Sequence, residues 1–338
     1  MTDNSQPARR VSLRDVAREA GVAPSTVSRA LSLPDRVNDE TRARIEKIAA
    51  TLGYAKPSTA TDVSRSRAVA VVVSDVTNPF YFGIIRGTQQ QLKAAGYSQI
   101  LVDTEESDQN EDDLLHRLRS SYDGVILSAS RLADRALAAL AAEIPLVAIN
   151  RQTTGVASVF IDTPSGVVQA VEHLVSLGHR SIAYVSGPET SWSNESRWRA
   201  FAKATSAHAI TPTRLGPYSP RQLAGAAAAD AAINAGVTAV IAFNDLLAIG
   251  MLQRLASRGV RVPEDLSVVG CDDIFGADFC NPPLTTLAAP IEQTGRLAVS
   301  MLLARLDPQA APGARNTATL PTYLTVRGST GPAPTTKA

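Results

Sequence analysis

VSLRDVAREAGVAPSTVSRAL, residues Val11–Leu31, has the spacing of two short helices joined by a tight turn. Ser12 is a residue type that favours the start of a helix, and Gly21 is one that ends a helix in a left-handed turn. The apolar side chains between them recur at helical spacing and lie on one face: Leu13, Val16, Ala17 and Ala20. The first half of the stretch therefore predicts one amphipathic helix that ends at Gly21.

A second helix is predicted to begin at Pro24, because a proline in the first turn loses no helical hydrogen bond. A third is predicted to begin at Asn38 or Asp39 and to end at Gly53. The residues predicted to pack inside are Val27, Ala30 and Leu31 of the second helix and Ile45, Ile48, Ala49 and Leu52 of the third. Three short helices, the first two joined through Gly21-Val22-Ala23, predict a helix-turn-helix domain.

After this domain the pattern changes twice. Residues 55–67, AKPSTATDVSRSR, are polar and begin beside a proline, which is typical of a linker. From Ala68 onward, apolar runs alternate with amphipathic segments, as in parallel sheets covered on both faces. The predicted strands are Val69–Val76, Gln99–Asp103, Gly124–Ser128, Leu146–Asn150, Ser158–Asp162, Ile182–Ser186, Ala239–Phe243 and Ser267–Gly270. The predicted helices include Phe80–Ala95, Pro164–Leu177, Ser196–His208, Asp245–Arg258 and Ile291–Leu306.

This second region is too long for one compact doubly wound sheet, so two similar α/β lobes are expected. The predicted organisation is a DNA-binding domain at 1–57, a linker at 58–67, a two-lobed domain at 68–330 and a tail at 331–338. Ligands of open α/β sheets lie at the carboxyl ends of the strands, so polar residues there are candidates for a site.

Composition limits the classes of function. With 44% hydrophobic residues among 338, the chain is long enough to bury real cores, and no segment predicts a signal peptide or a membrane span, so a cytoplasmic protein is expected. Only Cys271 and Cys280 occur, without paired spacing, and no histidine cluster accompanies them; neither a metal site, a disulfide framework nor any other cofactor is predicted.

Charge is distributed unevenly along the chain. The net charge is +1, but residues 1–67 carry 12 Arg or Lys against 8 Asp or Glu, and the remainder carries 21 against 24. A basic N-terminal region followed by an acidic body suits a phosphate-contacting module attached to a sensor.

The chain resembles the LacI/GalR family of bacterial repressors over nearly its whole length. The opening stretch is followed by DRVNDETRARI and LGY, and further on by VSDVTNPFYFGIIRG, VEHLVSLGHRSIAYVSGP, FNDLLAIGMLQRLASRGVRVPEDLSVVGCDD and PPLTTL. The resemblance implies a lambda-repressor-like helix-turn-helix domain joined to a periplasmic-binding-protein-like body of two lobes with three crossovers. With these crossovers, lobe 1 is expected at about 68–160 and 289–319, and lobe 2 at about 161–288 and 320–330. It also implies a homodimer that binds a pseudo-palindromic double-stranded operator, with a small-molecule effector bound between the lobes and no membrane partner.

Carried over by position, the resemblance implies that the recognition helix spans Pro24–Leu31, with base contacts from Pro24, Ser25 and Arg29. An arginine at that place agrees with bidentate binding to guanine in the major groove. The full set of implied DNA-binding residues is Ser12, Leu13, Pro24, Ser25, Thr26, Ser28, Arg29, Asn38, Arg42 and Val63, most of the others as phosphate contacts. Thr26 and Ser28 have the alternative of simple solvation.

The linker departs from the family pattern. The family usually has Pro-Asn and, later, a leucine that inserts into the minor groove, where this chain has Lys56-Pro57 and Val63. Valine is a shorter wedge and Asp62 beside it would face phosphates, so weaker kinking of the groove, or a different central step, is expected.

The implied effector site lies at strand ends in both lobes. Lobe 1 is expected to contribute Asn78, Phe80, Asp103, Ser128 and Arg151, and lobe 2 Trp192, Arg197, Phe243, Asn244 and Asp272. Amide, carboxylate and guanidinium groups beside an aromatic wall suit a polyhydroxylated ligand, so a carbohydrate is favoured over a purine-type effector. Two alternatives stay open. One of Asp272 and Asp273 has the alternative of capping a turn. The rings of Phe80, Tyr81 and Phe82 have the alternative of packing in the lobe core. Of the two tryptophans, Trp192 is expected to overhang the cleft and Trp198 to pack against its own lobe.

Two other classes of protein are disfavoured by the sequence. An enzyme is disfavoured because His116, His173, His179 and His208 have no nucleophile beside them and no phosphate-binding loop or nucleophile elbow occurs. A solute-binding protein without operator function is disfavoured by the helix-turn-helix stretch. The sequence leaves open the effector's identity, the sign of its effect, the operator, and dimer against tetramer.

Overall fold

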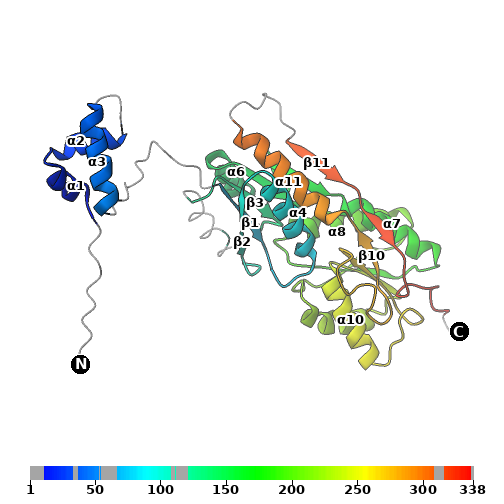
Figure 1. Cartoon of the computed structure of the whole chain (residues 1–338). Coiled ribbons are helices and arrows are strands. Elements are labelled where there is room, and N and C mark those ends of the chain that lie inside the picture. The colour runs from blue at the N-terminus through cyan, green and yellow to red at the C-terminus, as the bar shows by residue number, and fades with distance from the viewer. Residues whose placement is uncertain are drawn as a thin grey trace, which may run out of the picture. The chain divides into compact units, whose positions relative to one another are not determined.

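The computed structural model describes residues 11–32, 37–52, 54, 67–107, 111, 121–307 and 316–335. The chain divides into two compact units, Met1–Ser64 and Arg65–Ala338, which are considered separately (Figure 1). Most of the predicted linker, including Pro57, Asp62 and Val63, lies outside the described residues.

The small unit has three helices, α1 (Leu13–Ala20), α2 (Pro24–Ser32) and α3 (Asp39–Leu52), as predicted. At the start of α1 the Asp15 carboxylate accepts from the backbone N–H and the hydroxyl of Ser12, at 2.9 and 2.6 Å. Gly21 ends α1 with φ +65°, a backbone conformation that favours glycine. The core is small and aliphatic: Val16, Ala17, Ala20, Val27, Ala30, Ile45 and Ala49. Packing of these three apolar faces is what holds such short helices together.

The large unit contains two six-stranded sheets, one in each lobe. The first has the order β11-β5-β4-β3-β1-β2 and is parallel throughout. Its strands are β1 (Ala68–Val73), β2 (Ser98–Asp103), β3 (Gly124–Ser128), β4 (Leu146–Ile149), β5 (Ala157–Ile161) and β11 (Thr317–Leu320). The fold class predicted from the sequence, a helix-turn-helix domain followed by a two-lobed α/β body, is confirmed.

The second sheet has the order β12-β10-β9-β8-β6-β7 and is parallel except for β12, which runs antiparallel to β10. Its strands are β6 (Ile182–Val185), β7 (Thr213–Leu215), β8 (Ala239–Ala242), β9 (Ser267–Cys271), β10 (Thr285–Ala288) and β12 (Tyr323–Thr325). All residues of β6, β8 and β9 are buried, because helices cover both faces of this sheet.

Helices cover both faces of each sheet. In lobe 1, α4 (Phe80–Ala94) and α11 (Ile291–Leu306) cover one face and α6 (Asp134–Glu143) the other. Successive side chains of β1 point to opposite faces of the sheet. The core beneath α4 and α11 contains Val69, Val71 and Val73, and the core beneath α6 contains Ala70 and Val72. In lobe 2, α7 (Thr163–Ser176) and α8 (Trp192–Ala207) lie opposite α9 (Gly225–Asn234) and α10 (Asp245–Ser257), with a short 3-10 turn at Gln222–Ala224.

The chain crosses between the lobes three times, after β5, after β10 and after β11. Ile161 is the last residue of β5 and Leu320 the last of β11, so both belong to the first sheet, one residue beyond the predicted lobe boundaries. The predicted tail at 331–338 begins with residues bonded to lobe 2: Gly331 N–H donates to the Ser267 hydroxyl at 3.1 Å and Ala333 N–H to the Leu177 carbonyl at 2.9 Å. Lobe 2 therefore extends at least to Ala333.

Close approach of α4 and α11, which lie side by side in Figure 1, requires glycine at the contact. A Cβ at Gly87 would lie 2.1 Å from the carbonyl oxygen of Glu292, and one at Gly295 would lie 2.6 Å from that of Ile84. Backbone atoms cannot move aside as a flexible side chain can, so the two helices are fixed in register.

Gly87→Val is expected to lower the free energy of unfolding by about 3 kcal/mol, because the added side chain forces α4 away from α11. Urea unfolding followed by circular dichroism measures the loss. Gln89→Val, at an exposed position of the same helix, adds the same branched side chain without the clash and should cost less than about 1 kcal/mol. Equal losses in the two variants would contradict this packing.

Candidate functional site

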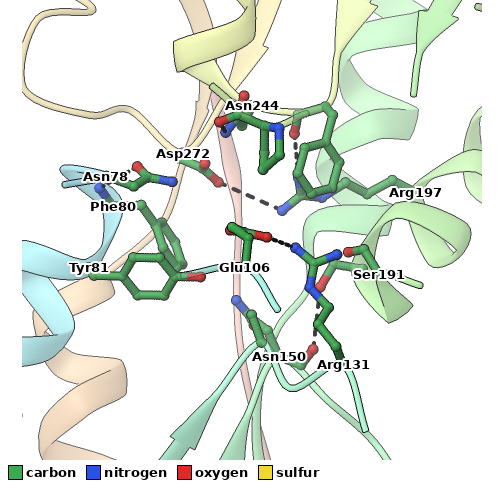
Figure 2. A pocket seen from close by; sticks show the side chains of 14 residues that line it. Asn78, Phe80, Tyr81, Glu106, Arg131, Asn150, Ser191, Arg197, Asn244 and Asp272 are labelled. Atoms are coloured by element: carbon green, nitrogen blue, oxygen red, sulfur yellow. Dashed lines mark hydrogen bonds and ion pairs between the residues drawn. The ribbon is translucent and has the colours of Figure 1, made fainter. Parts of the chain in front are cut away.

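A cleft between the lobes of the large unit opens at the carboxyl ends of the strands (Figure 2). Both lobes contribute side chains, most of them polar, and three aromatic rings form part of the wall. The lining residues are Asn78, Phe80, Tyr81, Glu106, Ala129, Arg131, Asn150, Ser191, Ser193, Arg197, Pro220, Phe243, Asn244 and Asp272.

Four lining residues have left-handed backbone conformations. Glu106, Ala129 and Asn150 have φ of +63°, +52° and +55°, and Asp272, directly after β9, has φ +125°. Such conformations are costly for residues other than glycine and cluster at functional sites. They redirect the chain sharply at the strand ends, where the cleft lies.

Arg197 is the central cation on the lobe 2 side. Its side chain is buried, its Nε donates to the Thr163 hydroxyl at 3.0 Å, and its Nη1 donates to the Phe243 carbonyl. The guanidinium carbon lies 5.0 Å from the centre of the Phe243 ring, within range of a cation–π interaction. Nη2 is 3.7 Å from the Asp272 carboxylate, too far for a hydrogen bond, so the two groups do not use their hydrogen-bonding capacity on each other.

Burial raises the pKa of two carboxyl groups on the lobe 2 side. It raises the pKa of Asp272 to about 7, and the charge of Arg197 opposes the rise. Behind Asp272, the fully buried Asp245 has a pKa raised to about 6, again by burial. Its carboxylate accepts from the Ile274 N–H at 2.9 Å and from the Thr286 hydroxyl, so it fixes the loop that carries Asp272.

The lobe 1 side combines an ion pair with two packed rings. The carboxylate of Glu106 pairs with the guanidinium of Arg131. Phe80 and Tyr81 meet edge to face with ring centres 5.1 Å apart, and the Asn78 side-chain oxygen accepts from the Phe80 N–H at 3.0 Å.

Three contacts join the lobes around the cleft. Arg221 Nε lies 3.2 Å from the Asp75 carboxylate, the Ser193 hydroxyl donates to the Asn150 carbonyl at 3.3 Å, and Trp192 meets Phe160 edge to face at 5.3 Å. The cavity that remains is about 40 Å³, room for a few water molecules. A larger ligand therefore requires the lobes to separate or the lining side chains to move.

Six of the ten predicted effector residues line the cleft: Asn78, Phe80, Arg197, Phe243, Asn244 and Asp272. Four do not. The Asp103 carboxylate accepts from the backbone of Val76 and Glu105, and Arg151 donates to the Leu132 carbonyl and pairs with Asp134 at 2.8 Å. Ser128 is buried at the end of β3, and Trp192 packs on Phe160 while its neighbours Ser191 and Ser193 line the cavity. Trp198, by contrast, stacks on Phe201 within its own lobe.

Among the lining residues that the sequence did not single out, Glu106 and Arg131 carry charge. They lie in the loops after β2 and β3, as a rule about strand ends would allow. Ser191 also caps α8, accepting from the Asn194 N–H, which starts that helix at Trp192 and not at the predicted Ser196.

The predicted DNA-binding residues of the small unit differ in exposure. Pro24, Ser25, Ser28 and Arg29 are exposed on α2, and the Arg29 side chain makes no hydrogen bond or ion pair with the described residues. Thr26 is half-buried, and Leu13 is half-buried against the small core. Asn38 accepts from the Glu40 N–H at 2.8 Å, and Arg42 lies 3.5 Å from Asp39 and 3.6 Å from Glu46. Val63 lies outside the described residues.

Other kinds of site are not apparent in the described part of the chain. Cys271 and Cys280 are free thiols, and within the described ranges no cluster of His, Cys, Asp and Glu has the geometry of a metal site. No helix among those described combines the length and apolar composition required to cross a membrane.

A helix-turn-helix unit followed by a two-lobed unit with a polar cleft defines the class of ligand-responsive DNA-binding proteins with a periplasmic-binding-protein-like body. Residues 12–57 match the model of bacterial regulatory proteins of the lacI family, and residues 171–330 match that of periplasmic binding protein-like domains. The HTH-type transcriptional repressor CytR of Escherichia coli is 33% identical over 94% of this chain and 96% of its own length. The HTH-type transcriptional regulator DegA of Bacillus subtilis is 29% identical over 96% of this chain and 99% of its own.

Solved structures agree with the sequence relatives. The transcriptional regulator CelR bound to cellobiose has a TM-score of 0.70 and 30% identity over 95% of this chain and 100% of its own. A lac repressor dimer bound to operator and an anti-inducer has a TM-score of 0.72 and 27% identity over 96% of this chain and 100% of its own. The chain belongs to the LacI family of bacterial regulatory proteins.

The raised pKa of Asp272 predicts a pH-dependent stability. A carboxyl with a pKa near 7 in the folded state and about 3.9 when unfolded stabilises the fold fully only below pH 4, and that stabilisation is lost as the pH rises through 7. Asp272→Asn resembles the protonated form. It should match the wild type near pH 4 and exceed its free energy of unfolding by about 2–4 kcal/mol at pH 8.

Urea unfolding followed by tryptophan fluorescence tests this, because both tryptophans of the chain lie on α8 of the large unit. Asp273→Asn is the matched control, since that carboxylate pairs with Arg327 at 2.7 Å and its loss should give no gain at pH 8. A difference between Asp272→Asn and wild type that does not change with pH would contradict the assigned shift.

Proposed function

We propose that this protein is a transcriptional repressor that acts in the cytoplasm on a pseudo-palindromic operator, with an affinity controlled by a carbohydrate-like effector in the interlobe cleft. One observation carries the proposal. The same chain has an exposed arginine on α2 without an ion-pair partner among the described residues, and a two-lobed body with a polar cleft lined in part by aromatic rings. CytR is named a repressor and CelR was solved with cellobiose. We propose no enzymatic activity, since the relatives compared are transcription regulators.

DNA recognition is assigned to α2. Arg29, exposed and without a protein partner among the described residues, is the base-reading cation, with Pro24 and Ser25 beside it at the start of the helix. Thr26, Ser28, Asn38 and Arg42 are assigned to phosphates, which fix the helix in register. The proposed domains are a DNA-binding domain to residue 57, a linker at 58–67 with Val63 at the minor groove, and the effector-binding unit after it.

A homodimer is proposed because two-fold symmetry matches two half-sites of a pseudo-palindrome. The large unit exposes apolar side chains that a single chain leaves in water: Leu223 at 93%, Phe275 at 79% and Phe279 at 64%. Phe275 and Phe279 pack edge to face on each other at 5.0 Å, and clustered exposed rings are typical of protein interfaces.

Effector control is proposed to work through the lobes. A sugar-sized ligand does not fit a 40 Å³ cavity, and separation of the lobes to admit it would change the contacts that join them, Arg221–Asp75 and Ser193–Asn150 among them. A ligand that binds one arrangement of the lobes better shifts the population toward it, and through the linkers shifts operator affinity.

Arg29→Ala should reduce affinity for the operator by tenfold to a hundredfold or more, the cost of one bidentate base contact on each of two heads, while leaving dimer formation intact. Gel shifts on fragments upstream of neighbouring genes measure it against unrelated DNA. Arg44→Ala, an exposed arginine of α3, removes the same charge and should preserve the preference. Undiminished sequence preference in Arg29→Ala would refute α2 as the reading helix.

Arg197→Ala should abolish the effector's influence on operator binding without changing operator affinity in its absence. Its guanidinium is the group that joins Thr163, Phe243 and Asp272 around the cleft. Operator titrations with and without the effector measure the response, and Arg199→Ala, an exposed arginine on the same helix, serves as control. A full response in the Arg197 variant would remove this residue from the site.

A further inference from the structure

Glu106 and Arg131 form a buried ion pair that intrudes into the cleft from lobe 1. The Glu106 side chain is 15% exposed and that of Arg131 is 6% exposed, and both line the cavity. Figure 2 shows the Glu106 carboxylate in the middle of the cleft, directed toward Arg131 and facing the Arg197–Asp272 pair of lobe 2. The two residues therefore meet a ligand as a charged couple and not as separate groups.

The backbone around the pair is fixed on both sides. Glu106 N–H donates to the Ser74 carbonyl at 2.6 Å, in a left-handed conformation with φ +63°. Arg131 N–H donates to the Glu111 carboxylate at 2.8 Å, and Glu111 also accepts from the Ser130 hydroxyl and is itself buried. The positions of both side chains are thus built into the strand-end loops.

The pair keeps hydrogen-bonding capacity for a ligand. The buried Arg131 Nε has no hydrogen-bond partner among the described residues. A buried donor without a partner destabilises the fold, so a ligand oxygen that accepts from it would remove this cost and bind more tightly. A carboxylate and a guanidinium side by side accept from and donate to hydroxyl groups, each of which does both.

Charge in the cleft is balanced lobe by lobe. Arg131 is matched by Glu106 in lobe 1. In lobe 2, Arg197 lies 3.7 Å from Asp272, whose pKa of about 7 leaves that carboxyl partly protonated at neutral pH. The other lining residues are uncharged at neutral pH. Outside the lining, Asp75 is matched by Arg221, and Asp103 accepts from backbone N–H groups. Burial raises the pKa of the Glu106 carboxyl above its ordinary value. Asp75 and Asp103 raise it further, while Arg131 and Arg221 lower it. On the lobe 1 side, an anionic ligand would meet no free cation and would lie against the Glu106 carboxylate.

We propose that the Glu106–Arg131 pair is a charge filter that restricts the cleft to uncharged polyhydroxylated ligands and excludes their carboxylate and phosphate derivatives. The inference rests on the proposed function, because it concerns the ligand class of the proposed effector cleft. Glu106 supplies the exclusion, since its charge neutralises the guanidinium that an anion would otherwise use.

The test uses the full chain and matched ligand pairs: glucose with glucuronate, galactose with galacturonate, and glucose and ribose with their phosphates. Thermal shifts across a concentration series give a dissociation constant for each. For the wild type, at least one neutral sugar should bind, and its charged derivative should bind at least tenfold more weakly. Glu106→Gln frees the Arg131 guanidinium and should improve binding of the charged derivative at least tenfold relative to the neutral sugar.

Two further variants separate the filter from mere packing. Glu105→Gln removes the same charge from the exposed neighbouring residue and should leave the ratio of the two affinities unchanged. Glu106→Gln combined with Arg131→Gln restores charge balance and should return the preference to the neutral ligand. Unchanged tryptophan fluorescence in each variant checks the fold of lobe 2.

The failures are distinguishable. A wild type that prefers the charged derivatives, or a Glu106→Gln variant with an unchanged ratio, overturns the filter and leaves the regulator intact. Binding of no sugar, neutral or charged, by a wild type that still recognises its operator overturns the carbohydrate effector and the filter with it.

Discussion

Compensation of the buried guanidinium of Arg197 is the constraint on which the cleft depends. The side chain joins the start of α7 through Thr163, the end of β8 through Phe243 and the end of β9 through Asp272. A buried cation must be surrounded by acceptors and counter-charge, so these three points of lobe 2 cannot drift apart without leaving charge unsatisfied. Asp245 adds a second buried tie to the same loop, and together they hold Asp272 in a conformation it would not choose alone.

The sequence predicts the longer, apolar strands better than the short strands that contain polar residues. Strands such as β1 and β9 are continuous apolar runs, because helices cover both faces, and all eight predicted strands occur. The strands not predicted, β7, β10, β11 and β12, are three or four residues long and contain threonine or arginine, so no hydrophobic run marks them. Among the described helices, α6 and α9 are not marked individually by the sequence; α9 is rich in alanine and has a weak polar face.

The site divides along a similar line. Asn244 and Asp272 stand in one long motif that resembles the family, and Arg197, four residues before Phe201, stands at a position that the resemblance assigns to a ligand contact, so their place in the cleft is predictable from position alone. Arg151 and Asp103 follow strand ends equally well, yet each bonds to its own lobe. The opposite holds for Glu106 and Arg131, which meet only because two loops distant in sequence turn through left-handed residues toward each other. The pattern of residues along the sequence does not predict that geometry.

The chain passes between the lobes three times, and this affects when each lobe can fold during translation. Lobe 1 lacks its edge strand β11 and its covering helix α11 until residues 291–320 have been synthesised, and lobe 2 lacks β12 until a few residues later. Domains tend to fold as they leave the ribosome, N-terminal first. Here the small helical unit can do so early, whereas lobe 1 must wait until translation is almost complete, because α11 covers one face of β4 and β5. The helix-turn-helix unit is thus free to meet DNA before its sensor exists.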